Sequence, residues 1–191
     1  MPAASGLAGL ASANSEERWA AVRAAAGLPD GVQALAGALA SETDVRVREA
    51  IFTALARIGT HDCAAVVAPY IRSDDASLRT GALDALRLMP EAVAALLPAL
   101  LADADADVRL LACDLARNLP GDAASRSLSA LLQREPEANV CAAAVEVLAE
   151  VGGVDALRAL EACRARFAGD PFLSFAITVA AERIGALRPR P

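Results

Sequence analysis

Apolar side chains recur along this chain in blocks that have the spacing of an amphipathic helix. Counted from Val47 as position zero, the first clear block has apolar residues at positions 4, 7, 8 and 11. At 100° per residue these positions fall within one narrow arc, which indicates a helix with one face in a core. Comparable blocks begin at Leu78, Val108, Val140 and Leu173, and position zero of the N-terminal block is Glu17. No run alternates with period two, so we predict no sheet.

A residue that favours the end of a helix follows each block at a nearly constant interval. These residues are Pro29, Gly59, Pro90, Pro120, Gly152 and Gly185, and they are 30, 31, 30, 32 and 33 residues apart. A period near thirty with two helix-length segments per unit is typical of helical repeats that stack on one another. The sequence therefore predicts an all-α fold of repeated helical hairpins.

Each repeat reads as a first helix, a short acidic turn and a second helix. The first helices are expected over roughly 30–41, 61–72, 91–102, 122–134 and 154–167. Three residues before position zero of the second helices stand Asn14, Asp44, Asp75, Asp105, Glu137 and Asp170. Such side chains cap free backbone N–H groups, and the acidic ones suit the positive end of the helix dipole. The stretch 16–28 is expected to be a lone second helix.

These repeats resemble HEAT repeats, in particular the HEAT-like type first recognised in phycocyanobilin lyases. The residues that carry the resemblance run from Asp44-Val45-Arg46-Val47-Arg48 through Ala54-Leu55 to Ile58-Gly59, with close copies from Asp75 to Pro90 and from Asp105 to Pro120. The resemblance implies a right-handed α-solenoid of about five hairpin repeats plus an N-terminal half-repeat, with the second helices on its concave face. The solenoid would span residues 14–188, between a flexible segment at 1–13 and a tail at 189–191.

The resemblance also implies a ladder of aspartate and arginine side chains along the turns between helices. The expected pairs are Asp44 with Arg48, Asp75 with Arg79 and Asp105 with Arg109, together with Asn14 and Arg18. Each pair is separated by four residues, so both side chains share one helix face. Because Cys141 and Ser174 stand in the arginine place, the ladder is expected to end after Arg109.

The outward face of the second helices is the best candidate for a binding surface. If the repeats stack in register, Asp84, Asp114 and Glu146 form an acidic row beside Arg87 and Arg117. Two interpretations stay open: local ion pairs worth roughly a few tenths of a kcal/mol, or a charged groove that selects a partner segment. The candidate partner-binding residues are Trp19, Arg23, Phe52, Arg57, Asp84, Arg87, Asp114, Arg117, Glu146 and Glu150.

An apolar edge runs beside that face. Position five of the second helices holds Val22, Phe52, Leu83, Cys113 and Val145. Because a helix in a repeat stack touches both neighbours, we interpret this edge mainly as core between repeats; a binding stripe is the alternative. Trp19 lies on the terminal half-repeat, where cover is thinnest, and is the best single anchor candidate.

The composition narrows the possible functions. A chain of 191 residues with 55% hydrophobic content can bury a substantial core. The net charge of −6 repels polyanions, and the linear sequence shows no strong basic patch for nucleic acid or anionic membranes. All 18 basic residues are arginine, which excludes a lysine nucleophile and a P-loop. The apolar segment 171–181 is shorter than the about 20 residues that cross a bilayer.

Catalytic and metal-binding motifs are missing from the sequence. The single histidine, His61, cannot build a metal cluster by itself. The cysteines, Cys63, Cys113, Cys141 and Cys163, lie in apolar stretches without CxxC spacing, so we expect buried thiols in a reducing compartment. We expect no cofactor, no metal and a cytoplasmic location.

The sequence thus favours a non-enzymatic scaffold or adaptor whose concave face binds an extended or helical segment of another protein, with no nucleic-acid or membrane partner. The repeat type suggests one alternative, a bilin lyase-like enzyme or chromophore chaperone subunit. A second alternative is DNA binding, as in the HEAT-like alkylpurine DNA glycosylases. Acidity and only six aromatic residues argue against DNA binding.

Overall fold

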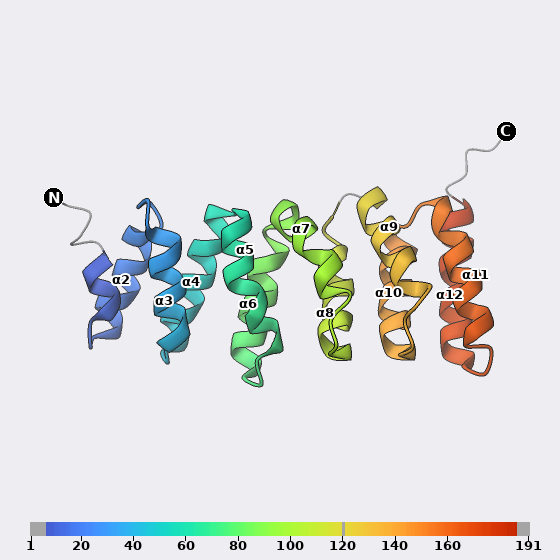
Figure 1. The fold of residues 1–191 in the computed structure, drawn as a ribbon, viewed down its shortest axis with the longest axis horizontal. Coiled ribbons are helices and arrows are strands. Elements are labelled where there is room, and N and C mark those ends of the chain that lie inside the picture. The colour runs from blue at the N-terminus through green and yellow to red at the C-terminus, as the bar shows by residue number, and fades with distance from the viewer. Residues whose placement is uncertain (1–6, 120, 187–191) are drawn as a thin grey trace. The chain divides into compact units, whose positions relative to one another are not determined.

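The computed structural model of the protein describes residues 7–119 and 121–186, and every regular element in these ranges is a helix (Figure 1). The chain forms two compact units, Met1–Val93 (unit 1) and Ala94–Pro191 (unit 2). Helix α7, Pro90–Leu100, contains the division between them. The predicted all-α fold of helical hairpins is confirmed.

Unit 1 is built in two layers. The second helices lie side by side in one layer: α2 (Ser15–Ala25), α4 (Val45–Ile58) and α6 (Ala76–Arg87). The first helices α3 (Gly31–Ser41) and α5 (His61–Val67) form the other. After α5 the chain tightens into the 3-10 helix η2 (Ala68–Arg72), where Pro69 lacks the N–H that an α-helix would use.

Unit 2 repeats the same arrangement. Its second helices are α8 (Ala106–Ala116), α10 (Ala138–Val151) and α12 (Pro171–Ala186), with α10 between the other two. The first helices α9 (Gly121–Leu132) and α11 (Leu157–Arg166) pack together in the other layer, and the 3-10 helix η3 (Val154–Ala156) leads into α11. The predicted helix ranges therefore correspond closely to the observed ones.

The N-terminal part of the described chain is packed. The 3-10 helix η1 (Gly9–Ala11) contacts α2, and a Cβ added to Gly9 would lie 2.9 Å from the Cβ of Ala21. The segment 1–13, which is expected from the sequence to be flexible, thus includes a turn that lies against α2. Residues 1–6 and the tail 189–191 lie outside the described residues.

The side chains at position five of the second helices belong to the core. These side chains are at most 7% exposed: Val22, Phe52, Leu83, Cys113 and Val145. Within each unit this position lies where one second helix meets the next: Phe52 packs against Gly81 of α6, and Cys113 contacts Val140 of α10. The apolar edge is therefore core, as we interpreted it, and not a binding stripe. In α12 the same position is Thr178, which is exposed. The apolar edge therefore stops at α12.

The predicted helix starts are largely confirmed. The side chains of Asn14, Asp44, Asp75, Asp105 and Asp170 all accept hydrogen bonds from backbone N–H groups of the following helix. Glu137 makes no such bond, and its own N–H donates to Glu135 instead. A glutamate side chain is one methylene longer than aspartate and suits this cap less well.

The helix ends follow the prediction less closely. Gly59 ends α4 in the left-handed conformation, with φ of 69°, which glycine adopts without strain. Pro90 begins α7 instead of closing α6, at a first helical position where proline costs no hydrogen bond. Gly185 is the second-last residue of α12, which ends at Ala186. Pro120 lies outside the described residues.

The ladder residues are paired differently from the prediction. Asp44, Asp75 and Asp105 cap their own helices, as described above. Arg48 does not turn back to Asp44 but reaches forward, and its Nη1 donates to Oδ2 of Asp75 at 2.9 Å. Arg79 donates to the backbone carbonyl of Ser73 at 2.7 Å. The arginines therefore bind the turns, and Arg48 links one repeat to the next.

Two of these arginines make the same forked contact in the two units. Arg18 donates through Nε and Nη2 to the two carboxylate oxygens of Glu42, at 2.7 and 2.8 Å. Arg109 does the same to Glu135, at 2.8 Å for both bonds. In each case Nη1 also donates to two backbone carbonyls of the preceding turn. Each guanidinium therefore joins its own turn to the turn of the next repeat.

Glu42 and Glu135 are not among the residues predicted from the sequence. Their side chains are only 4% and 2% exposed, and charged groups are rarely buried unless they are paired. The signal that would have found them is positional, since both stand five residues before position zero of a repeat. In the last repeat that place is Ala168, and the arginine of the preceding repeat is replaced by Cys141. Where the arginine of one repeat is absent, the buried glutamate of the next repeat is therefore absent too.

Where the ladder ends, Arg166 binds the turn after α9. Arg166, at the end of α11, donates to the backbone carbonyls of Leu132 at 2.7 Å and Glu135 at 2.9 Å. This agrees with the expectation that the ladder ends after Arg109. Cys141, in the former arginine place, is buried with its thiol 3.7 Å from the carbonyl of Glu135.

All four cysteines are free and buried, as the sequence predicts. Burial raises the pKa of Cys113 to about 12. A thiol with so high a pKa is protonated at neutral pH and unreactive, because the thiolate is the nucleophile. Cys113 therefore acts as a small core side chain, in contact with the carbonyl of Val140 in the next second helix.

Electrostatics of the two forks favour ionised glutamates. The hydrogen bond from Arg18 lowers the pKa of Glu42. For Glu135, burial acts to raise the pKa, but the hydrogen bonds from Arg109 and from the Glu137 N–H outweigh it, so the pKa is lowered. A carboxylate whose pKa is lower in the folded state stabilises that state above its ordinary pKa, and this contribution is lost as the pH falls through the lowered value.

We predict that Glu135→Gln lowers the free energy of unfolding by about 2 kcal/mol at neutral pH, because it leaves the Arg109 guanidinium without its charge partner. Urea unfolding measures the change. Glu161→Gln, in an exposed ion pair with Arg164, is the control and should change stability by less than about 0.5 kcal/mol.

We also predict that the free energy of unfolding of the wild type decreases more steeply below pH 4.5, the ordinary pKa of glutamate, than that of the double variant Glu42→Gln/Glu135→Gln. The variant has lost the two carboxylates whose protonation weakens the folded state. Parallel curves for the two proteins between pH 3 and pH 6 would show that the forks do not contribute in this way.

Candidate functional site

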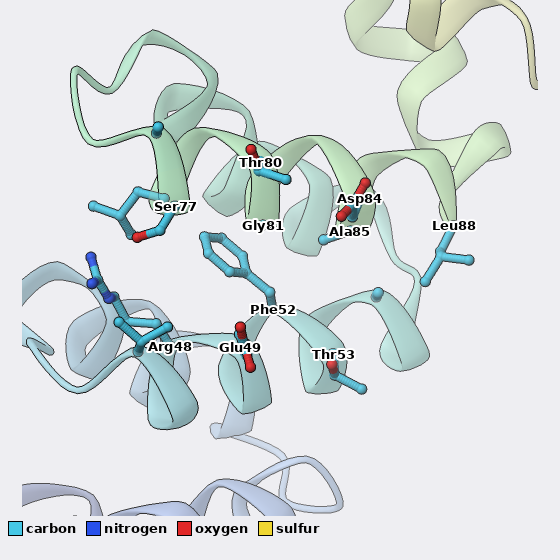
Figure 2. Close-up of a pocket in the computed structure, with 14 residues that line it drawn as sticks. Arg48, Glu49, Phe52, Thr53, Ser77, Thr80, Gly81, Asp84, Ala85 and Leu88 are labelled. Carbon is cyan, nitrogen blue, oxygen red and sulfur yellow. The ribbon is translucent and has the colours of Figure 1, made fainter.

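The outward face of the second helices in unit 1 carries two adjoining hollows. One lies between α2 and α4 and has a volume of about 1040 Å³ (the α2–α4 hollow). The other lies between α4 and α6 and has a volume of about 670 Å³ (the α4–α6 hollow, Figure 2). Glu49 and Thr53 line both hollows. The two hollows therefore meet over α4 and form one surface across three helices.

The α2–α4 hollow brings together three of the predicted partner-binding residues. Trp19 and Arg23 come from α2 and Arg57 from α4. Trp19 is half-buried, and the Arg23 guanidinium lies 5.4 Å from the centre of its ring, within range of a cation–π contact. The stacked pair forms one wall of the hollow, with a fixed aromatic surface and an exposed charge.

The α4–α6 hollow has an apolar floor. Figure 2 shows the ring of Phe52 between the two helices, below Gly81, with Arg48 near one end of the hollow and Leu88 at the other. A Cβ added to Gly81 would lie 2.7 Å from Cδ2 of Phe52. Glycine is therefore needed here so that the ring can pack against the backbone of α6. The ring of Tyr70 lies nearly perpendicular to that of Phe52, at 83°, with the ring centroids 6.0 Å apart.

Phe52 needs a correction as a candidate binding residue. Its side chain belongs to the core between repeats and is only 4% exposed, because α6 covers the ring through Gly81. Exposed apolar surface at this hollow comes instead from Leu88, which is 71% exposed, and Val45, which is 46% exposed. The sequence analysis did not select these two residues.

The predicted acidic residues are engaged in ion pairs. In unit 1, Arg87 donates to Asp84 at 2.6 Å. In unit 2, Arg117 lies 3.5 Å from Asp114 and 3.3 Å from Glu146, and it also contacts Glu150. The hydrogen bond that Arg117 donates to Glu150 raises the pKa of Arg117, because it favours the charged guanidinium. The pairs of Arg87 with Asp84 and of Arg117 with Asp114 are the local pairs of the first interpretation, whereas Glu146 and Glu150 reach Arg117 from the next second helix.

Several lining residues escaped the sequence analysis. Arg46, Glu49 and Thr53 are exposed and line the α2–α4 hollow. They occupy positions −1, 2 and 6 of their helix, and Trp19 and Arg23 occupy positions 2 and 6 of theirs. The repeat register therefore contained the signal, because the same positions face the same surface in neighbouring helices.

Unit 2 also exposes aromatic side chains on its last second helix. Phe172 and Phe175 of α12 are 85% and 71% exposed. They stand at positions −1 and 2, the register that lines the hollows in unit 1. At positions 1 and 5, α12 has Ser174 and Thr178. The face of α12 that carries these two positions is thus more polar than its outward face.

Neither a metal centre nor a membrane span is found in the part of the chain that the structure describes. Within residues 7–119 and 121–186, no three histidine, cysteine or acidic side chains gather in a way that could hold a metal ion. The helices of the same ranges are too short or too polar to cross a membrane. His61 is exposed at the start of α5.

Comparison with known families confirms the resemblance to HEAT repeats. Residues 5–87 match the family model for HEAT repeats. The finer assignment to the phycocyanobilin lyase type is not confirmed and stays a prediction. No curated protein matches the sequence.

Solved structures share the fold at low sequence identity. The archaeal HEAT-like repeats protein from Thermococcus onnurineus NA1 is 16% identical, with a TM-score of 0.52 over 95% of this chain and 86% of that chain. Human deoxyhypusine hydroxylase in complex with glycerol is 15% identical, with a TM-score of 0.50 over 97% of this chain and 96% of that chain. At these identities the similarity shows the fold alone.

We predict that Gly81→Ala lowers the free energy of unfolding by about 1 kcal/mol. The new methyl group overlaps the Phe52 ring, and overpacking of about 1–3 kcal/mol exceeds the gain of about 1 kcal/mol in helix propensity. Gly37→Ala is the matched control: Gly37 also lies inside a helix, but its added Cβ meets nothing within 4 Å. That variant should be more stable than the wild type in thermal unfolding. Equal stabilisation by both substitutions would contradict the close contact at Gly81.

Proposed function

We propose that this HEAT-repeat chain is a non-enzymatic protein-binding scaffold, and that the second-helix face of unit 1 holds a segment of another protein. The observation that carries the proposal is the pair of adjoining hollows over α2, α4 and α6. Hollows of this size accept side chains, and a surface that crosses several helices accepts a continuous segment.

The wall formed by Trp19 and Arg23 is suited to act as an anchor. Tryptophan and arginine are enriched among the residues that contribute most to protein interfaces. Trp19 is half-buried against its own helix layer, so little side-chain freedom is left to lose when a partner binds. A half-buried ring of this kind lowers the entropic cost of association.

Several side chains around the hollows are exposed and do not hold the repeats together, so they are available to contact a partner. Thr53, Arg57 and Leu88 are exposed and take no part in the forks that join the repeats.

A similar fold occurs in an enzyme, human deoxyhypusine hydroxylase. The fold therefore does not decide the function, and the function must be argued from the site. The lining consists mainly of arginine, threonine, alanine and apolar side chains.

The proposed location is a reducing, cytoplasmic compartment. Four free cysteines are buried inside the helical layers. Disulfide bonds are rare in the cytosol, where thiols are kept reduced. A scaffold that relies on these side chains as small core residues suits such a compartment.

Blocking the face where the hollows meet tests the proposal. Thr53→Tyr places a large side chain at the point that both hollows share. We expect wild-type protein, immobilised and exposed to an extract of its source organism, to retain a partner that Thr53→Tyr does not retain, because the added ring occupies the space of the bound segment. Mass spectrometry of the retained proteins compares the two.

The matched control is Gln33→Tyr, which adds the same side chain to an exposed position on α3 in the other layer. It should retain the same partner as the wild type. Circular dichroism should show equal helicity for all three proteins. Identical sets of retained proteins for both variants would contradict a role of the second-helix face.

A further inference from the structure

The α2–α4 hollow concentrates positive charge on a protein that is acidic as a whole. Its charged lining residues are Arg23, Arg46 and Arg57 against Glu49 alone, whereas the chain carries a net charge of −6. The three arginines come from two helices that lie side by side. Folding therefore assembles a basic patch that the linear sequence does not show.

The fold makes little use of these three guanidinium groups. Arg57 forms no ion pair or hydrogen bond with any residue that the structure describes. Arg23 contacts the face of Trp19, which leaves its N–H donors exposed. Arg46 lies 3.0 Å from Glu16, but the two side chains are 69% and 66% exposed, and such surface pairs contribute little. A carboxylate from a partner can therefore compete for all three.

Arg48, two residues after Arg46, shows the contrast. Its side chain is only 12% exposed and is bound to Asp75. Arg48 faces the α4–α6 hollow, whose other lining includes the exposed apolar side chains of Val45 and Leu88. The excess of positive charge thus lies in the α2–α4 hollow, whereas the α4–α6 hollow carries Arg48 against Glu49 and Asp84 and has the exposed apolar side chains.

From this division we infer that the bound segment is acidic and extended, with aspartate or glutamate side chains over the α2–α4 hollow and an apolar side chain in the α4–α6 hollow. The inference rests on the proposed function and names the chemical class of its partner. Packed helices lie about 8–10 Å apart, and an extended chain advances about 3.3 Å per residue. The acidic and apolar side chains should therefore stand about three residues apart.

A nucleic acid fits the same surface less well. Its affinity depends on many phosphate contacts, and a protein of net charge −6 repels a long polyanion beyond the few arginines of the hollow. The apolar side chains beside the patch would face a sugar–phosphate backbone without a matching group. A protein segment can supply both the carboxylates and the apolar side chain.

A random peptide library displayed on phage tests the inference with defined probes. Peptides are selected on the wild type and kept when binding is lost on Thr53→Tyr but retained on Gln33→Tyr. We expect this set to be enriched in aspartate and glutamate, with an apolar residue about three positions away from the acidic ones. Duplex DNA added as a competitor should not displace them.

Charge reversal at the hollow provides the second arm. Arg23→Glu/Arg57→Glu should weaken binding of a selected acidic peptide by at least about tenfold, because like charges then face each other. Replacing the acidic residues of that peptide by lysine should restore binding to the double variant. Arg126→Glu/Arg158→Glu changes the net charge equally but lies in unit 2, and it should bind the original peptide as the wild type does.

The possible outcomes separate the two proposals. Peptides that depend on Thr53 but are neutral or basic would overturn the inference and leave the scaffold function standing. Displacement of acidic peptides by duplex DNA at similar concentration would also overturn it, because the hollow would then be a general polyanion site. If no selected peptide distinguishes Thr53→Tyr from Gln33→Tyr, the proposed function itself fails.

Discussion

No hairpin of this chain can bury its apolar face alone, and the contact between neighbouring second helices is the interaction on which the rest of the structure depends. Phe52 in unit 1 and Cys113 in unit 2 are both buried at such a contact. Full burial of a large apolar side chain stabilises the folded state by about 2 kcal/mol. Because the same contact recurs, each repeat supports the next in its unit.

Close packing of the second helices brings successive turns within reach of one another, and the arginine forks follow from that proximity. Glu42 and Glu135 lie almost out of solvent, where an unpaired carboxylate would be costly. The arginine of the preceding repeat satisfies both oxygens and also binds the backbone of its own turn. Where the arginine is absent, after Arg109, the buried acid of the next repeat is absent too, and Arg166 binds the turn from a different helix.

The proposed binding face consists of the positions that neither contact uses. Once the apolar positions are buried and the ladder arginines are engaged, positions 2 and 6 of each second helix are left to solvent. In unit 1 these hold Trp19, Arg23, Glu49 and Thr53 around the two hollows. In unit 2 the corresponding acids, Asp114 and Glu146, are drawn together by Arg117. The same register therefore lines an open basic hollow in one unit and forms a surface cluster of ion pairs in the other.

Several features could be predicted from the sequence because they depend on local spacing. The helix ranges follow from periodicity, since side chains three and four residues apart share a helix face. The caps at Asp44, Asp75 and Asp105 follow from residue type, since a short acidic side chain reaches the N–H groups two or three residues ahead. The burial of the cysteines follows from their apolar surroundings.

The partners of charged side chains were decided only by the tertiary structure. Arg48 has Asp44 four residues away, yet it binds Asp75, 27 residues ahead. Phe52 packs against the backbone of the next helix, where Gly81 leaves room for its ring. The basic hollow joins Arg23 to Arg57 across two helices. Local periodicity determines which residues face outward, whereas the distance between charges on different helices depends on how those helices pack.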